Sequence, residues 1–386
     1  MLQLALRNYL KRVTPLRKLV QALKALEARY RDNVWILRGR ERTTQEPLTI
    51  FFAGHHESKN YIAHLILGEN WTESKKMRIR RKQLQRRACA ENAPHELAIV
   101  QMDSIPPALA QQPDVFFVPC WVGSERDLRA TTELFRKENV KSDIRRIRKN
   151  HLGYRVTRDP QEFERFYYTM YLPHIKRIYG DRAFLMTYKD MQAAIAQCEL
   201  FLITQDGQDV AGAILLYGET EYVRGWSGGV KDGDIGWVKA GALSAIQYFQ
   251  TQYLIDKGVI RLHCGASRPF LNDGVLRFKK KWGVGIVDRA PKWFAILPLR
   301  GCASVTAFMV NNPFIYERDG KLQSAFFLTD DAQPSEADIG RLFHDLYMPG
   351  LDGITLFRLK VGGVTEPDLS IRPYVRVNAS GSICPQ

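Results

Sequence analysis

The stretch ELFLITQDGQDVAGAILLYGETEYVRGWSGG, residues 199–229, decides the fold. Apolar and β-branched residues dominate three runs in it, at 199–205, 210–218 and 221–229, and predict three β-strands. The Asp206-Gly207 step predicts a tight hairpin between the first two strands, because glycine supplies the positive φ that such turns need. We therefore expect an antiparallel meander of three strands here.

Helices and strands are expected on both sides of this meander. Proline is favourable at the first position of a helix, and glycine is favourable just after the last one. The expected elements are, in chain order, a strand at 153–159, a long helix opening at Pro160, a shorter helix at 188–197, the meander, a helix at 237–255 followed by Gly258, a strand at 260–267, a helix at 272–282, and strands at 283–290 and 293–299.

Four regions are expected along the chain: residues 1–32, 33–140, 141–298 and 299–386. The first is helical, with apolar residues near helical spacing between basic ones, and either packs on the next domain or lies on a membrane surface. The second is a small α/β domain with strands at 34–39, 48–54, 61–68, 97–102 and 115–122 and a basic helical segment at 75–88. The last contains a hairpin around Asp319-Gly320 and a helix capped by Ser335, with Asp338 at the third helical position.

The composition is that of a globular protein with a buried core, since 45% of the 386 residues are hydrophobic and 25% are charged. No apolar run is long enough to span a bilayer, and none at the N-terminus resembles a signal peptide. Six scattered cysteines form no CxxC pair, and the spacing of His55, His56 and His64 does not match HExxH. We expect a cytoplasmic protein, with peripheral contact to the inner face of the membrane as one option, and no metal.

The formal net charge of +15 favours partners that carry phosphate or other acidic groups. One basic cluster, DIRRIRKN at 143–150, suits a helix between the two halves. It is either a solvated linker helix or a helix that contacts phosphate. In the second case Arg145, Arg146 and Lys149 bind the substrate, and Arg145 and Lys149 share a helix face.

The order of elements from Gly153 to Pro298 resembles that of the GNAT superfamily of acyltransferases. The resemblance implies that the strand before the long helix parts from its neighbour and leaves peptide groups free for an acyl donor. It also implies a glycine-rich turn that presents amides to phosphate. The cofactor-binding residues expected on this basis are Trp226, Ser227, Gly228, Gly229, Lys231, Gly233, Gly236, Lys239 and Asn272.

The string SRPFLNDGVLRFKKKWG, residues 267–283, looks like the FemAB/CelD-like branch of that superfamily, whose members often carry an FKxxW or FKxxF block. Ordinary members have a tyrosine seven residues after the asparagine, and here that position is Lys279. The resemblance implies that Lys279 donates a proton or stabilises the developing oxyanion. It also implies a tandem fold in which residues 34–140 are a degenerate GNAT-like half.

Several other residues are candidates for a functional role, and each also has a purely structural explanation. Arg268 and Asp273 flank Asn272 and either bind the substrate or form a salt-bridged turn. Glu221 is either a catalytic base or a solvated residue at the start of its strand. Tyr222 and Trp226 either line the acceptor groove or belong to the core, and His263 is either catalytic or a hydrogen-bonded core residue.

The expected activity is direct transfer of an acyl or aminoacyl group to an amine. The donor is acyl-CoA or aminoacyl-tRNA, and the resemblance implies an amine-bearing acceptor in the cell envelope or on a polysaccharide. Two alternatives remain at this stage. Instead of a transferase, the protein is either a catalytically inactive GNAT-like scaffold or a basic RNA-binding protein.

Overall fold

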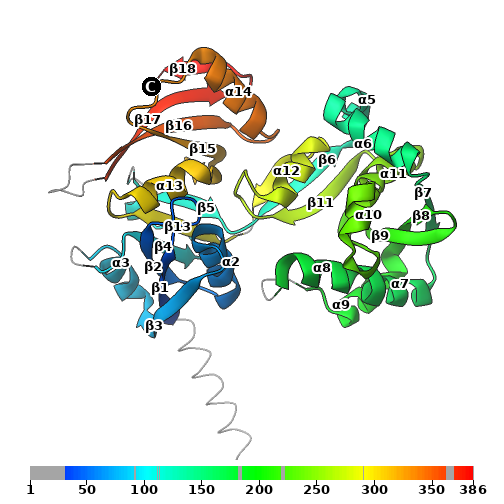
Figure 1. Cartoon of the computed structure of the whole chain (residues 1–386), viewed down its shortest axis with the longest axis horizontal. Helices are drawn as coiled ribbons and strands as arrows, with labels where there is room; N and C mark the ends of the chain where they lie inside the picture. Colours follow the sequence, from blue (N-terminus) through cyan, green and yellow to red (C-terminus); the bar gives the residue numbers. More distant parts are fainter. Residues whose placement is uncertain are drawn as a thin grey trace, which may run out of the picture.

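Two mixed β-sheets with helices packed on them form the α/β fold that the sequence predicts. The computed structural model describes residues 31–90, 93–110, 112, 114–180, 185–218, 222–289, 291–361 and 369–385. One sheet has eleven strands and the other has seven. Figure 1 shows the larger sheet in the left part of the molecule and the smaller one in the right part. The expected helical segment at 1–32 falls almost wholly outside the described residues, and Arg31 already belongs to the first strand.

The seven-stranded sheet contains the predicted meander. Its strands, in spatial order, are β12 (Gly285–Arg289), β6 (Val122–Asp127), β11 (Arg261–Ser267), β10 (Tyr222–Val230), β9 (Gln208–Tyr217), β8 (Cys198–Gln205) and β7 (Gly153–Thr157). The strands β8, β9 and β10 pair antiparallel in sequence, whereas β10 and β11 run parallel. This order confirms the GNAT-like arrangement of the second half.

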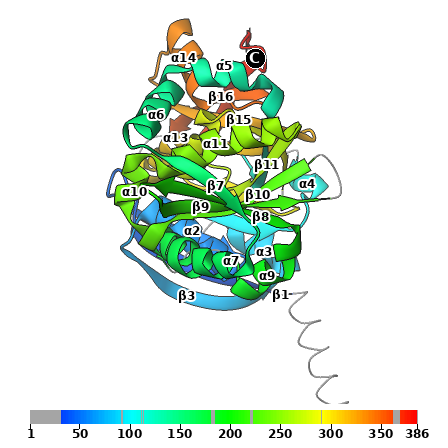
Figure 2. The same ribbon diagram turned by 90° about the vertical axis from the view of Figure 1, so that its right-hand side faces the viewer.

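Helices cover both faces of this sheet, as Figure 2 shows. They are α5 (Thr131–Arg136), α6 (Glu138–Lys149), α7 (Pro160–Phe166), α8 (Leu172–Tyr179), α9 (Tyr188–Ala194), α10 (Ile235–Ala240), α11 (Ala242–Asp256) and α12 (Gly274–Lys281). The single helix predicted from Pro160 is divided by a π-helical turn at Tyr167–Tyr171. The one predicted at 237–255 is divided at Gly241, whose φ of 99° is left-handed and ends α10.

The eleven-stranded sheet runs through the first half and the C-terminal region. Its strands, in spatial order, are β18 (Ile383–Pro385), β17 (Leu369–Asn378), β16 (Gly353–Val361), β15 (Lys321–Thr329), β14 (Phe314–Arg318), β5 (Phe116–Pro119), β13 (Trp293–Pro298), β4 (Leu97–Met102), β2 (Pro47–Ala53), β1 (Arg31–Arg40) and β3 (Trp71–Arg80). Its helices are α2 (His56–Leu67), α3 (Arg81–Ala88), α4 (Pro107–Ala110), α13 (Ala303–Asn311) and α14 (Glu336–Leu346).

Each half contains a pair of parallel neighbouring strands, β2 and β4 in the first half and β10 and β11 in the second. The connection between β10 and β11 consists of helices, whereas the connection between β2 and β4 contains α2, the edge strand β3 and α3. In each half the next position in the sheet is filled by a strand of the other half, β13 beside β4 and β6 beside β11. The tandem arrangement is thus visible in the strand order itself.

Two predictions for the first half are wrong. Residues 61–68 lie largely in α2 rather than in a strand, because Ile62, Ala63 and Ile66 recur at helical spacing and bury one helix face. The segment 75–88 is not one helix, since its first part belongs to the edge strand β3 and its second part forms α3.

The sheets also cross the predicted domain boundaries. The strand predicted at 115–122 is divided between β5 in one sheet and β6 in the other, so that residues before 141 complete the second-half sheet. In the same way, β13 lies before residue 299 but pairs with β4 and β5 of the first half. The two halves therefore exchange strands.

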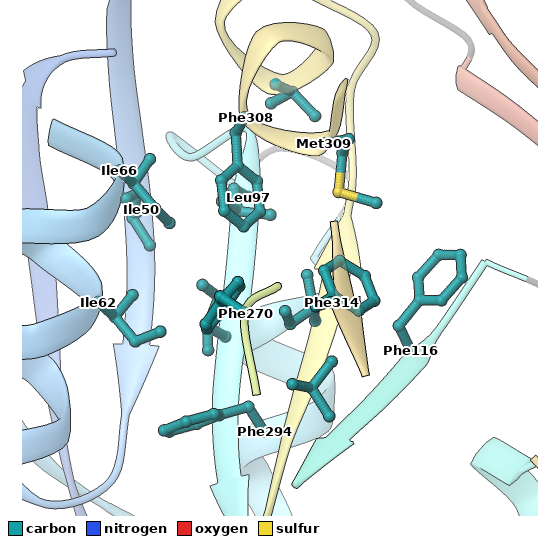
Figure 3. Close-up of a cluster of buried hydrophobic side chains, with 14 of the residues drawn as sticks. Ile50, Ile62, Ile66, Leu97, Phe116, Phe270, Phe294, Phe308, Met309 and Phe314 are labelled. Atoms are coloured by element: carbon teal, nitrogen blue, oxygen red, sulfur yellow. The ribbon is translucent and has the colours of Figure 1, made fainter. Parts of the chain in front are cut away.

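The C-terminal region contains the predicted hairpin, β14 and β15, and the predicted helix α14, on which Ser335 and Asp338 form a capping box. The sequence did not reveal β16, β17 and β18, which extend the large sheet beyond β15. The apolar core beneath this sheet joins the N-terminal and C-terminal parts, as Figure 3 shows for Ile50, Phe116 and Phe314. Among the described residues, no helix has both the length and the apolar character needed to cross a bilayer.

Candidate active site

The strands β10 and β11 part after a short paired segment. They pair only where Tyr222, Val223 and Arg224 face Arg261, Leu262 and His263. Beyond that point β10 continues to Val230 and remains paired with β9, while β11 continues to Ser267 and bends at Gly265, whose φ is 70°. In the described part of the chain, the later peptide groups of β10 therefore have no partner strand on the side of β11.

A cavity of about 880 Å³ lies at this opening, between the two halves of the molecule. Its walls come from α2, α8, β10, β11, the start of α12 and the segment after α13. The aromatic, polar and charged residues of its lining include Tyr61, Trp121, Trp226, Ser227, Ser267, Arg268, Asp273 and Lys279, and Gly228 lies among them. A cavity of this size between two halves of a protein is a common setting for a substrate site.

Lys279 points into the sheet rather than into solvent. Its Nζ donates to Ser124 Oγ at 3.0 Å, to the carbonyl of Gly265 at 3.1 Å and to the carbonyl of Ala266 at 3.3 Å. Burial lowers the pKa of this ammonium to about 8, although Asp273 opposes the shift. The group is therefore poised to gain or lose a proton near neutral pH.

Strand exchange supplies one of the groups that hold Lys279. Ser124 lies on β6, which belongs to the first half in sequence but pairs with β11. Its hydroxyl donates to the carbonyl of Gly265 at 2.8 Å and accepts from Lys279. Ser124 could not be identified from the sequence, because more than a hundred residues separate it from the motif around Lys279.

Arg268 forms a flat cationic wall of the cavity. Its guanidinium lies 3.9 Å from the ring centre of Trp121 and 4.3 Å from that of Tyr61, and it donates to the carbonyl of Cys120 at 3.1 Å. Burial lowers the pKa of Arg268, and the two aromatic faces compensate part of the lost hydration. The sequence singled out Arg268, but not Tyr61 or Trp121.

Asp273 begins α12 and faces the same cavity. One carboxylate oxygen, Oδ1, accepts from the amides of Val275 at 2.9 Å and Leu276 at 3.2 Å, as an N-cap does. In the described structure no cation lies within ion-pair distance of Asp273, so the salt-bridged turn considered for it is absent. Its second oxygen remains available to a ligand.

Several hydroxyl groups in the cavity wall lack a hydrogen-bond partner. Tyr61 Oη, Ser227 Oγ and Ser267 Oγ are buried and have none within the described structure. Burial raises the pKa of the Tyr61 hydroxyl, so that it keeps its proton. Buried polar groups are usually satisfied, and a bound molecule is one way to satisfy these.

The structure places the predicted cofactor residues in two groups. Trp226, Ser227, Gly228 and Asn272 line the cavity, and Asn272 also donates to the carbonyl of Asn311 at 2.9 Å. The lining does not include Gly229, Lys231, Gly233, Gly236 and Lys239.

Contacts within the glycine-rich turn explain its composition without a ligand. A Cβ on Gly229 would lie 2.5 Å from the carbonyl oxygen of Met170, and one on Gly233 would lie 2.8 Å from that of Pro173. The amide of Gly236, at the start of α10, is already capped by the carboxylate of Asp234 at 2.8 Å. These glycines allow close packing on the π-helical turn and α8, and the turn is not part of the site proposed below.

The remaining candidates lie away from the cavity lining. Arg145, Arg146 and Lys149 surround a separate hollow together with Lys239. Tyr222 is 38% exposed, and its ring lies tilted against that of His263 with the ring centres 5.8 Å apart.

His263 itself is a buried, hydrogen-bonded residue, since its Nδ1 accepts from the amide of Gly265 at 3.2 Å. Glu221, predicted as a base, lies outside the described residues.

No protein-family model matches the chain, and no curated protein matches it in sequence. Solved structures similar to it include the C-terminal domain of a putative lysylphosphatidylglycerol synthetase from Agrobacterium fabrum, with 15% identity, a TM-score of 0.35, and coverage of 72% of this chain and 84% of that one. FemX has 14% identity and a TM-score of 0.34 over 68% of this chain and 84% of its own.

A GCN5-related N-acetyltransferase-like protein from Streptococcus suis has 12% identity and a TM-score of 0.27 over 69% of this chain and 83% of its own. The fold assignment rests on the strand order and on the parting of β10 and β11.

Proposed function

We propose that the cavity is the site of transfer of an acyl or aminoacyl group to an amine. One observation carries the proposal: β10 and β11 part beside Lys279 and open into a cavity between the two halves. Unpaired peptide groups at the edge of a strand can hold the carbonyl or amide groups of a donor, as in the addition of a β-strand. The donor lies along β10, against Trp226, Ser227 and Gly228.

Lys279 acts on the charge that develops during transfer. When the amine attacks the carbonyl carbon, the carbonyl oxygen becomes negative and needs a nearby positive charge or hydrogen-bond donor. Of the three hydrogen bonds of Lys279, the longest, to the carbonyl of Ala266, is partly exposed, and the donor oxygen replaces it. The leaving thiol or hydroxyl then takes its proton from Lys279 or from water.

Asp273 binds the acceptor. An amine is largely an ammonium ion at neutral pH, and the available carboxylate oxygen of Asp273 attracts it into the cavity. The carboxylate or a water molecule beside it accepts the proton that the amine must lose. Arg268, whose guanidinium contacts Trp121 and Tyr61, adds a positive charge that suits an anionic group elsewhere on the acceptor.

The reaction needs no covalent intermediate on the protein. The amine nitrogen forms a bond to the carbonyl carbon, the bond to the leaving group breaks, and one proton passes from nitrogen to the leaving group through side chains or water. The donor is a thioester of coenzyme A or an aminoacyl ester of tRNA. The acceptor is an amine of the cell envelope or of a polysaccharide precursor.

The test is a transfer assay with both donor classes. Purified protein is incubated with a series of acyl-CoA thioesters or with a mixture of charged tRNAs, together with amine acceptors, and the products are identified by mass spectrometry. We expect one donor class to be consumed only when acceptor is present. Lys279→Met should then lower kcat about 100-fold or more, because it removes a charge aimed at the transition state.

Lys280→Met is the matched control. Lys280 follows Lys279 on α12, but its Nζ donates to the carbonyl of His344 at 2.7 Å, away from the cavity. We expect Lys280→Met to retain near-normal kcat. Equal activity of the two variants, or no transfer from any donor in either class, would refute the proposal.

A further inference from the structure

A second hollow, separate from the cavity, lies where α6 and α10 end side by side. The two helices lie in the right-hand part of Figure 1 and at the left of Figure 2, and Asn150 joins them by donating to the carbonyl of Ala240 at 2.8 Å. The hollow has a volume of about 530 Å³. Its lining consists of Ser142, Arg145, Arg146, Lys149, Asn150, Lys239 and Ala240.

The hollow is strongly cationic. Four of its seven lining residues carry a positive charge, and none carries a negative one. In the described structure no carboxylate lies within ion-pair distance of Arg145, Lys149 or Lys239. Arg146 is 3.5 Å from Asp143, but that buried carboxylate has a closer cation in Lys281 at 2.6 Å.

Helix ends alone do not account for this cluster. Cations near a helix C-terminus interact favourably with the helix dipole, which stabilises Arg146 and Lys149 on α6 and Lys239 on α10. However, Arg145 and Lys149 lie four residues apart on one face, where like charges repel. Lys239, from another helix, adds a further like charge to the same hollow. Such an arrangement is stabilised when an anion is bound.

We propose that this hollow binds the diphosphate group of a small ligand. Four cations around one concavity match a diphosphate group, with its two linked sets of anionic oxygens, better than a single phosphate. The planar guanidinium of arginine can donate two parallel hydrogen bonds to phosphate oxygens, and lysine brings a compact positive charge on a flexible side chain. Ser142 and the side-chain amide of Asn150 supply neutral donors at the rim. This site goes beyond the transfer reaction proposed for the cavity.

Binding of inorganic pyrophosphate to the intact protein, measured by isothermal titration calorimetry at fixed ionic strength, tests the proposal. Orthophosphate and sulfate serve as weaker anions for comparison. We expect pyrophosphate to bind most tightly. Arg145→Gln with Lys149→Gln should weaken binding about tenfold or more, since two charge-assisted contacts are lost. Lys239→Gln should also weaken it, although it lies on a different helix.

The double variant Arg86→Gln with Arg87→Gln is the matched control, because it removes the same charge from exposed residues of α3. It should bind pyrophosphate like the wild type. An equal loss in this control would show a general charge effect and overturn the proposal, as would unchanged binding in the Arg145 and Lys149 variant.

Further arms of the experiment identify the source of the diphosphate. Coenzyme A, a nucleoside diphosphate and a lipid-linked diphosphate in detergent are each titrated in competition with pyrophosphate. Competition by any of them supports the site. Binding of an RNA oligonucleotide or of anionic phospholipid vesicles that depends on Arg145 and Lys149, without any binding of pyrophosphate, would contradict it. Because Lys279 has no part in these measurements, failure here leaves the transfer proposal intact.

Discussion

Lys279 and Lys280 are neighbours on α12 with different surroundings. Burial lowers the pKa of each ammonium to about 8. Lys279 lies against β11 at the cavity, whereas Lys280 contacts the C-terminal region through the carbonyl of His344. Variants of the two residues can therefore be compared. An effect on transfer that depends on the cavity appears only for Lys279, whereas a general effect of removing a buried lysine appears for both.

Transfer should lose activity as the pH rises through about 8. Burial lowers the pKa of Lys279 from 10.5 to about 8, so its ammonium is fully charged only well below pH 8 and neutral well above it. If that charge stabilises the transition state, kcat/KM falls on the basic side. In Lys279→Arg the guanidinium stays charged, and any basic limb due to this residue should move beyond pH 10. The pH–rate profiles of the wild type and both variants measure this.

Lys280→Met provides the control for that profile. The pH–rate profile of this variant should still fall near pH 8, because the ammonium of Lys280 takes no part in transfer. If the Lys279→Arg variant is active and its kcat/KM still falls near pH 8, the group that titrates there is not Lys279.

About half of the candidate site could be predicted from the sequence. Arg268, Asn272, Asp273 and Lys279 lie in one short stretch at 267–283, and all line the cavity. Their nearness was predictable, because a strand end and the helix that follows it keep such residues together. Tyr61 comes from a helix of the other half, and no local pattern indicates that it meets Arg268.

The position of β10 depends on the close contact between Gly229 and the backbone of the π-helical turn at Tyr167–Tyr171. Gly229→Ala would bring Cβ to 2.5 Å from the carbonyl oxygen of Met170, so the strand or the π-helical turn must move. We expect this variant to lower the free energy of unfolding by about 2 kcal/mol or more. Denaturant titration measures the change.

Gly228→Ala is the matched substitution one residue earlier. There the nearest atom, the carbonyl oxygen of Gly212, would lie 3.3 Å from Cβ, so the loss of stability should be smaller. Gly228 lines the cavity, and its variant should instead impair transfer. The reverse order of stabilities would argue against the packing role given to Gly229.

Local patterns predicted most elements of the second half and fewer of the first. The meander has an unambiguous turn at Asp206-Gly207 and long apolar runs, and it formed as expected. Residues 61–68 were misread because a short apolar run fits a strand and a buried helix equally well. The break at Gly241 depends on its left-handed backbone conformation, which the sequence alone did not reveal.

At the scale of the whole molecule, the halves are joined by exchanged strands. The strand β6 lies between β11 and β12, and β13 lies between β4 and β5. Pairing between segments so distant in sequence leaves no local signal, so the exchange could not be predicted. It places Ser124 beside Lys279 and fixes the cavity between the halves.

Separating the chain after residue 140 should prevent each piece from folding alone. The second piece would lose β6 from its place between β11 and β12, and the first would lose β13 from its place between β4 and β5. We expect neither piece to show a cooperative thermal transition, whereas the two produced together should assemble and regain transfer activity. Circular dichroism and calorimetry of the pieces measure this. A piece from residue 141 onward that unfolds cooperatively by itself would contradict the structural role of the exchange.

The most direct measurement is a crystal structure of the protein with a non-reactive analogue of the donor that the transfer assay identifies. The account predicts density for the analogue along β10, with its carbonyl against Gly228 and within hydrogen-bond distance of Lys279 Nζ. Density for the reactive carbonyl anywhere else, with β10 and β11 closed together at the cavity, would contradict it.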